Sequence, residues 1–157
     1  MAREHHYQVT VDWTGNLGTG TSDYRKYGRD HAITVDGKPA ILSSSDPAFR
    51  GDPARWNPED MLVGSLSSCH MLWYLHLCAV NHIVVTSYRD AADGVMEEGG
   101  DGGGHFTRVT LRPRIVVKPG ADLDKARALH HTAHEKCFIA NSVNFPVDCA
   151  PEFHVEA

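Results

Sequence analysis

The chain has 157 residues, of which 41% are apolar and 22% are charged, and its formal net charge is −5 at pH 7. This length and composition are typical of a single folded domain over residues 1–157 with a substantial core, and they disfavour intrinsic disorder. The negative charge disfavours nucleic-acid binding, and the lack of a signal core or of an apolar run of ~18 residues predicts a cytoplasmic protein without a membrane partner.

The first part of the chain is predicted to form strands. Residues 7–13 alternate between apolar and polar side chains, and residues 31–35 form a second such segment. Asp36-Gly37 favours a tight hairpin turn into a third strand over residues 38–42. Residues 43–56 are rich in Pro, Ser and Asp. A loop of this length in a compact domain indicates a functional or partner-covering role.

A long apolar helix is predicted over residues 57–78. Asn57 can cap its N-terminus, and Pro58 suits the first helical position. Glu59 and Asp60 place negative charge at the positive end of the helix dipole. The rest of the segment is apolar or small on almost every side, which predicts burial on most faces. A chain of this size cannot easily cover such a helix alone, so the pattern favours a dimer that packs two of these helices together.

The remainder of the chain is predicted to form more strands and one further helix. A long antiparallel hairpin is indicated, with one arm at 83–96, a flexible acidic tip at 97–104 and the other arm at 105–117. Asp122 or Asp124 can cap a second helix that runs to about Cys137. A last strand is expected over residues 143–155. The predicted fold class is therefore α+β with antiparallel sheet.

The four cysteines do not form a Cys-x-x-Cys motif, which disfavours a zinc ribbon or a thioredoxin-type site. Cys69, inside the long helix, is either a small buried apolar residue or a reactive thiol. A reactive thiol requires a nearby cation that favours its thiolate. Because Cys69 lies about three turns into the helix, the dipole is too distant to help, and Arg25 or Arg29 is the candidate cation.

The other three cysteines are predicted to have different environments. Cys137 is at the C-terminal end of a helix, where the dipole disfavours a thiolate. This suits a resolving cysteine, although a structural role is favoured for Cys137 taken alone. Cys78 lies nine residues after Cys69, on the opposite face of the helix, and is expected to be in the core. Cys149 has no distinguishing context, and we interpret it as structural.

The histidines offer an alternative chemistry. His130 and His134 are one helical turn apart, which is a metal-chelating spacing, and Cys137 follows closely. His131 and Glu135 form a second pair at the same spacing. This pattern lacks the internal Glu of a zinc-protease motif, and histidines spaced in this way are more often surface residues. A non-catalytic metal-binding or small-ligand-binding protein is therefore the alternative function.

Taken together, these segments resemble the OsmC/Ohr family of cysteine-based hydroperoxide reductases. The resemblance rests on Asn57-Pro58-Glu59 opening the long helix and on Cys69 ten residues after that Glu. It also rests on Lys136-Cys137-x-x-x-x-Ser142 and on Gly28-Arg29-Asp30, where the family's active-site arginine follows the first strand. The order of elements is similar as well, so the resemblance spans nearly the whole chain.

The resemblance implies a fold, an activity and a set of partners. The fold would have antiparallel sheets wrapped around two central helices in an intertwined homodimer. The activity would be thiol-dependent reduction of organic hydroperoxides to alcohols, as part of an oxidative stress response, without a metal or flavin cofactor. The reductant would be a dithiol, lipoyl-linked in the Ohr branch, and both active sites would lie at the dimer interface.

The resemblance also implies catalytic roles for four residues. Cys69 would be the peroxidatic cysteine, which becomes a sulfenic acid, and Cys137 the resolving cysteine, which forms a disulfide with it. Arg29 would stabilise the thiolate and polarise the peroxide, and Glu59 would orient Arg29 through a bidentate ion pair.

Three points stay open at the level of sequence. Arg25 could replace Arg29 as the cation that contacts substrate. His70, directly after Cys69, could contact substrate as a proton donor or simply fill space. Glu59 and Cys69 would lie ~15 Å apart on one continuous helix, so either the helix breaks near Gly64 or Glu59 serves a site shared with the partner chain.

Overall fold

Three short strands near the N-terminus pair into an antiparallel sheet, β1 (Thr10–Trp13), β2 (His31–Thr34) and β3 (Ile41–Ser43). They belong to the first of two units, residues 1–61 and 62–157, in the computed structural model, which describes residues 1–157. β1 starts only at Thr10 because the partner strand β2 ends opposite it, at Thr34. The predicted turn between β2 and β3 forms, with Gly37 at a φ of +74°. The expectation of one domain over residues 1–157 stays a prediction.

The long loop after β3 is ordered by hydrogen bonds within the first unit. Ser43 Oγ and the Ser44 N–H both donate to the Trp56 carbonyl, at 2.7 and 2.8 Å. Between these ends lies a short 3-10 helix, η1 (Pro47–Phe49), whose N-terminus is capped by the Asp46 side chain. The two ends of the loop are therefore hydrogen-bonded to each other, just before the next helix begins.

The long helix α1 spans Pro58–Val80 without interruption. Asn57 caps it as predicted, because its Oδ1 accepts a hydrogen bond from the Asp60 N–H at 2.8 Å. The alternative in which the helix breaks near Gly64 is wrong. Only one face of α1 is buried within the chain, through Leu66, His70, Tyr74, Leu77 and Cys78.

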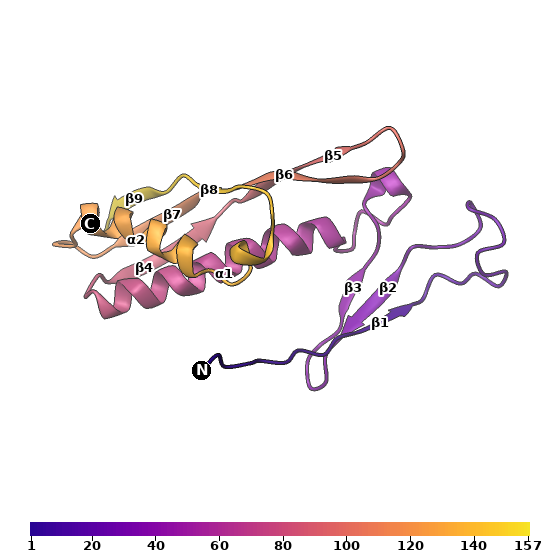
Figure 1. Ribbon diagram of the computed structural model, residues 1–157, viewed down its shortest axis with the longest axis horizontal. Coiled ribbons are helices and arrows are strands. Elements are labelled where there is room, and N and C mark those ends of the chain that lie inside the picture. The colour runs from indigo at the N-terminus through magenta and orange to yellow at the C-terminus, as the bar shows by residue number, and fades with distance from the viewer. The chain divides into compact units, whose positions relative to one another are not determined.

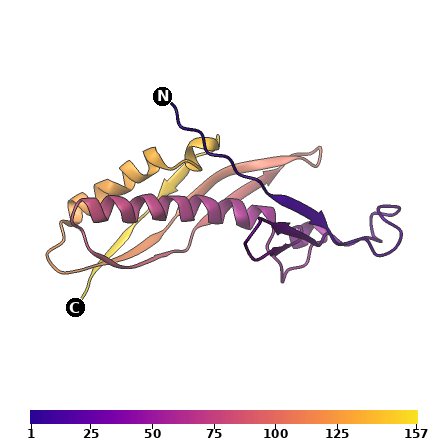
Figure 2. The same cartoon turned by 90° about the horizontal axis from the view of Figure 1, so that it is seen from below.

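The predicted long hairpin is present in the second unit as two consecutive strand pairs. β5 (Asp93–Glu98) and β6 (Gly104–Leu111) pair antiparallel around the Gly-rich tip, and Figure 2 shows them as an extended ribbon. β4 (Val85–Asp90) and β7 (Pro113–Val117) pair antiparallel at the base. At the break between the pairs, Asp90 Oδ1 accepts a hydrogen bond from the Arg112 N–H at 2.6 Å.

The last part of the chain forms two strands, not the one that was expected. β8 (Val147–Cys149) pairs parallel with β6, and β9 (Glu152–Val155) pairs parallel with β7. Pro151 lies between the two strands and has no N–H to donate to a sheet, so pairing is interrupted there. The α+β fold class is confirmed, but the sheets of the second unit are mixed and not purely antiparallel.

Helix α2 (Leu123–Lys136) packs along α1 in the second unit (Figure 1). Asp122 is its cap, because its side chain accepts from the Lys125 N–H at 3.0 Å. The Tyr74 hydroxyl donates to the Ala126 carbonyl at 2.9 Å and joins the two helices. The main core lies between both helices and β4, β7 and β9. Neither helix combines the length and the apolar character that crossing a membrane would require.

Candidate functional site

The two thiols that the resemblance singles out are neighbours in the second unit. Cys69 is half-buried on α1, and Cys137, at the C-terminus of α2, is only 1% exposed. Burial raises the pKa of Cys137, and the adjacent Cys69 thiol, as a hydrogen-bonding group and as a charge, raises it further. Both thiols are free. The fold thus brings together two sulfur atoms that are far apart in the sequence.

The chain around Cys137 holds its sulfur in place. The Ala140 N–H donates to Cys137 Sγ at 3.4 Å, which by itself lowers the pKa of the thiol. Burial outweighs this hydrogen bond, and the pKa of Cys137 rises to about 11. Cys137 is consequently protonated near neutral pH, as expected for a thiol that waits for an oxidised partner and does not attack first.

A second cluster in the same unit brings two histidines and a cysteine together. His70 comes from α1, His130 from α2 and Cys149 from β8. His70 Nε2 lies 3.0 Å from His130 Nδ1, and Cys149 Sγ lies 3.8 Å from the first nitrogen and 3.7 Å from the second. Both histidines are buried, and Cys149 is half-buried. This constellation could hold a metal ion.

The surroundings of the cluster keep its imidazoles neutral. Burial lowers the pKa of His70 to about 4, with a further lowering by the charge of His134 and a partial opposing effect of Asp90. Burial also lowers the pKa of His130 to about 3. The Tyr74 ring stacks on the His130 ring, with centroids 3.7 Å apart. His70 is therefore a neutral imidazole engaged with His130, and its predicted contact with substrate stays a prediction.

Sequence reasoning missed this cluster. The sequence predicts a structural Cys149 and a pairing of His130 with His134, whereas the structure groups His130 with His70 and Cys149. His134 is half-buried outside the cluster, and its neighbour His131 makes an exposed ion pair with Glu135 at 3.3 Å. The local signal in the sequence is the helical spacing of Ala126, Leu129 and Ala133, which places His130 on the apolar face of α2.

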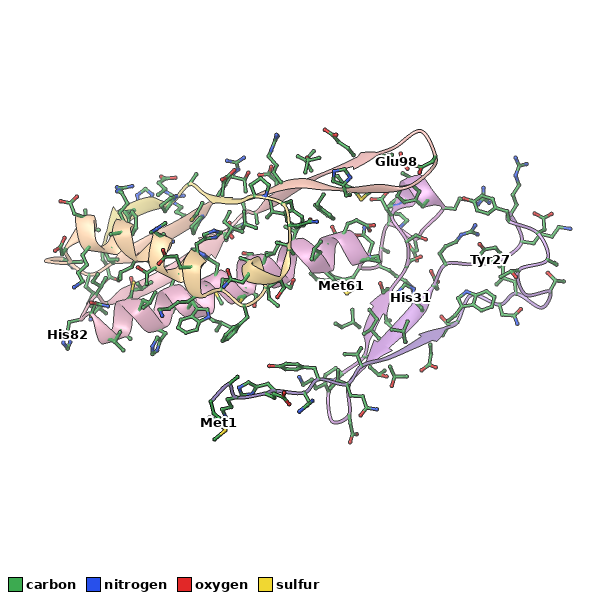
Figure 3. The ribbon with its side chains drawn as sticks, in the orientation of Figure 1. Met1, Tyr27, His31, Met61, His82 and Glu98 are labelled. Atoms are coloured by element: carbon green, nitrogen blue, oxygen red, sulfur yellow. The ribbon has the colours of Figure 1, made fainter.

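The first unit contains a cavity of about 330 Å³ that is lined by both Arg29 and Glu59. Its walls include three aromatic side chains, Trp13, Tyr27 and Phe49. Tyr27, labelled in Figure 3, also packs its ring against the Arg29 guanidinium, 3.9 Å from the ring centroid. The cavity thus combines the cation Arg29 and the acidic residues Asp46 and Glu59 with aromatic walls.

Arg29 is positioned by a close contact between two glycines. The Gly28 N–H donates to the Gly15 carbonyl at 2.8 Å. A Cβ on Gly15 would lie 2.0 Å from the Gly28 carbonyl oxygen, so only glycine allows this approach. The Arg29 guanidinium then donates to the carbonyls of Tyr27 and Tyr24, at 2.5 and 2.8 Å. Arg29 is therefore a fixed cation at the base of the preceding loop.

The other two candidates in the first unit differ in their settings. Arg25 is exposed and does not line the cavity, whereas Arg29 is half-buried and does. Glu59 Oε2 is buried without a hydrogen-bond partner. Because the Arg29 hydrogen bonds go to carbonyl groups, the bidentate pair between Arg29 and Glu59 stays a prediction.

Comparison with known proteins identifies the kind of fold. A family model described as OsmC-like protein matches residues 51–152. The structure is similar to an OsmC-like protein of unknown function from Vibrio cholerae, with 34% sequence identity and a TM-score of 0.85 over 94% of this chain and 99% of that one. No curated protein matches the sequence significantly.

More distant structures share the fold. An organic hydroperoxide resistance protein OsmC from Legionella pneumophila is 19% identical, with a TM-score of 0.68 over 96% of this chain and 98% of that one. The organic hydroperoxide resistance protein OhrB of Bacillus subtilis is 21% identical, with a TM-score of 0.63 over 94% of this chain and 96% of that one. At these identities the likeness establishes the fold alone.

Proposed function

Because the chain belongs to the OsmC family, which includes proteins named for organic hydroperoxide resistance, we propose that it is a thiol-dependent peroxidase for organic hydroperoxides. The observation that carries this proposal is that the Cys69 thiol is near enough to the buried Cys137 thiol to raise its pKa. Two free thiols that are neighbours, one half-buried and one fully buried, are the minimum required for a sulfenic acid that resolves to a disulfide.

The reaction proceeds in two chemical steps. The Cys69 thiolate attacks the terminal oxygen of the hydroperoxide, the O–O bond breaks, and the alkoxide leaves as the alcohol after it takes up a proton. Cys69 is thereby oxidised to a sulfenic acid. The Cys137 sulfur then attacks the Cys69 sulfur, which forms the disulfide and releases water. An external dithiol reduces this disulfide by exchange and becomes a disulfide itself.

The roles of the two cysteines follow from their environments. The pKa of Cys137 is raised to about 11, chiefly by burial, so this thiol stays protonated until Cys69 is oxidised. Cys69 is half-buried and is the thiol of the pair that a substrate can approach. These environments agree with the family resemblance, which implies that Cys69 attacks the peroxide and that Cys137 resolves the sulfenic acid.

Arg29 and Glu59 complete the proposed machinery. A guanidinium stabilises an attacking thiolate and the alkoxide that leaves, because both carry negative charge. Arg29 is half-buried against aromatic rings, in a cavity whose walls include three aromatic side chains, and these also suit the organic part of a hydroperoxide. Glu59, whose buried oxygen has no partner, would orient the guanidinium. Since α1 is unbroken, we propose that Glu59 acts on a site completed by the partner chain.

A homodimer is part of the proposal. α1 buries only one of its faces within the chain, although most of its residues are apolar. Leu72 on α1 is 61% exposed, and Phe138 next to Cys137 is 70% exposed. Burying such side chains between two copies of the chain would remove apolar surface from water. A cytoplasmic location and a lipoyl-linked dithiol as reductant also stay proposals.

The experiment that tests the function is peroxide consumption with a matched pair of variants. Wild-type protein, Cys69→Ser and Cys78→Ser are supplied with cumene hydroperoxide and dihydrolipoamide, and the loss of peroxide is followed. Cys78 is a buried thiol of the same helix with no role in the proposed reaction. We expect Cys69→Ser to lose consumption and Cys78→Ser to keep it. Undiminished consumption by Cys69→Ser would refute the proposal.

A further inference from the structure

The cluster of His70, His130 and Cys149 has the dimensions of a tetrahedral metal site. Zinc binds imidazole nitrogen at about 2.0–2.1 Å and thiolate sulfur at about 2.3 Å. At the tetrahedral angle, two nitrogen ligands then lie about 3.3 Å apart, and a nitrogen and a sulfur about 3.6 Å apart. The observed separations are 3.0 Å between the nitrogens and 3.7 and 3.8 Å from the sulfur. A metal ion would fit among the three atoms with shifts of a few tenths of an ångström.

The chemistry of the three side chains also suits zinc. Imidazole nitrogen and thiolate sulfur are common zinc ligands, and the three candidate ligand atoms lie within 4.8 Å of one another. A mixed set of imidazole and thiolate ligands favours zinc over magnesium or calcium, which prefer oxygen. Three protein ligands leave a fourth position, and the half-buried Cys149 marks the side from which an ion and a water molecule could enter.

Charge balance supports the same reading. A zinc ion with one thiolate and two neutral imidazoles carries one net positive charge. The Asp90 carboxylate is close enough to affect both His70 and Cys149 electrostatically. Asp90 is itself held by the Ser67 hydroxyl at 2.5 Å and by the Arg112 N–H at 2.6 Å. A fixed negative charge therefore stands beside a cluster that would become positive on binding the ion.

Hydrogen bonding alone leaves the cluster incompletely explained. The two imidazoles share a single hydrogen bond, between His70 Nε2 and His130 Nδ1. Cys149 Sγ has only long contacts with the two nitrogens. A bound ion accounts for the convergence of these three ligand atoms, which lie within 4.8 Å of one another.

We propose that His70, His130 and Cys149 bind one zinc ion, separate in function from the redox pair. Binding exchanges the thiol proton of Cys149 for the metal and releases that proton to solvent. No bond to the peroxide and no change in oxidation state is involved. Because the ligands come from α1, α2 and β8, the ion would hold three elements of the second unit together and stabilise the fold.

The test uses the full, reduced, tag-free chain and the metal alone. Zinc content is measured after purification without chelator, and the metal-free protein is titrated with Co²⁺. We expect one zinc per chain, and on cobalt binding the near-ultraviolet thiolate-to-cobalt band together with visible bands of tetrahedral intensity. The thiolate band separates this site from binding at the exposed His5 and His6 near the N-terminus, which have no sulfur.

Two serine variants assign the sulfur ligand. Cys149→Ser should lose the thiolate band and bind the metal on the order of 100-fold more weakly, whereas Cys78→Ser, a matched buried thiol, should retain both. Zinc should raise the melting temperature of wild type and Cys78→Ser but not of Cys149→Ser, with circular dichroism confirming that each variant is folded. The proposal is overturned if folded wild type binds no metal, if Cys149→Ser keeps the band, or if the band is lost in Cys137→Ser instead.

Discussion

Cys137 and Cys149 are both thiols of the second unit, and burial raises the pKa of each. They differ in the side chains that lie next to them. Burial raises the pKa of Cys137 to about 11 and that of Cys149 to about 12. Cys137, however, lies against the thiol of Cys69 and accepts a backbone N–H from Ala140. Cys149 instead faces the nitrogens of two neutral imidazoles.

This difference shows that burial alone does not determine what a thiol can do. Both cysteines are protonated near neutral pH and neither attacks a substrate unaided. A thiol beside another thiol can form a disulfide once its neighbour is oxidised, whereas a thiol beside two imidazoles has the ligands of a metal site. The chemistry of each position is therefore decided by the side chain that the fold places next to it.

The largest effect that would separate the two thiols is on turnover. Cys137→Ser should slow peroxide turnover with dihydrolipoamide ~1000-fold, because the Cys69 sulfenic acid loses the thiol held beside it. The persistent sulfenic acid should be trapped by dimedone and detected by mass spectrometry. Cys149→Ser should change turnover by less than about tenfold. Equal losses in the two variants would contradict the assignment of the resolving role to Cys137 and not to Cys149.

The next effect concerns Arg29, the cation that we propose for the redox pair. Arg29→Met should lower kcat/KM for the hydroperoxide ~100-fold, because a fixed positive charge that stabilises the attacking sulfur and the leaving oxygen is removed. Arg25→Met is the matched comparison, since Arg25 is exposed and outside the cavity, and its loss should be much smaller. Steady-state kinetics of both variants decides between them. A larger loss in Arg25→Met would assign the role to Arg25.

The smallest effect is on stability in acid, and it belongs to the imidazole cluster. In the metal-free protein the pKa values of His70 and His130 are lowered to about 4 and about 3, chiefly by burial. The unfolded chain therefore takes up protons first, so stability is present above pH ~6.5 and is lost as the pH falls from there toward 4. Each histidine contributes up to about 1.4 kcal/mol per pH unit in this range.

Urea unfolding between pH 7 and pH 5 measures that slope. His130→Gln should reduce the dependence of the free energy of unfolding on pH, even if it also lowers stability at every pH. His131→Gln is the control, because His131 is exposed and should leave the slope near that of wild type. An unchanged slope in His130→Gln would show that the imidazole is not kept neutral by burial.

Much of the fold was accessible from the sequence because local signals agree with it. The cap at Asn57, the turn at Asp36-Gly37 and the long hairpin all form as expected. The parallel pairing of β8 and β9 was not predicted. Register between segments distant in the chain depends on tertiary packing, and a short apolar run does not specify the partner strand it will choose.

The candidate site also has a part that was expected from the sequence and a part that was not. The pairing of Cys69 with Cys137 was expected only from the family resemblance, and its redox role stays a prediction. The cluster around Cys149 was not, because its three ligands come from three elements and no two of them are close in sequence. The spacing of His130 and His134 predicts a pair within one helix, whereas His130 in fact contacts His70 of α1.

The most direct test of the central claim is the identity of the disulfide that forms on oxidation. The reduced protein is treated with one equivalent of cumene hydroperoxide, free thiols are alkylated at low pH, and non-reduced peptides are mapped by mass spectrometry. The account predicts one linkage, between the peptides that contain Cys69 and Cys137, with Cys78 and Cys149 alkylated. A different linkage, or no disulfide while the peroxide is consumed, would contradict it.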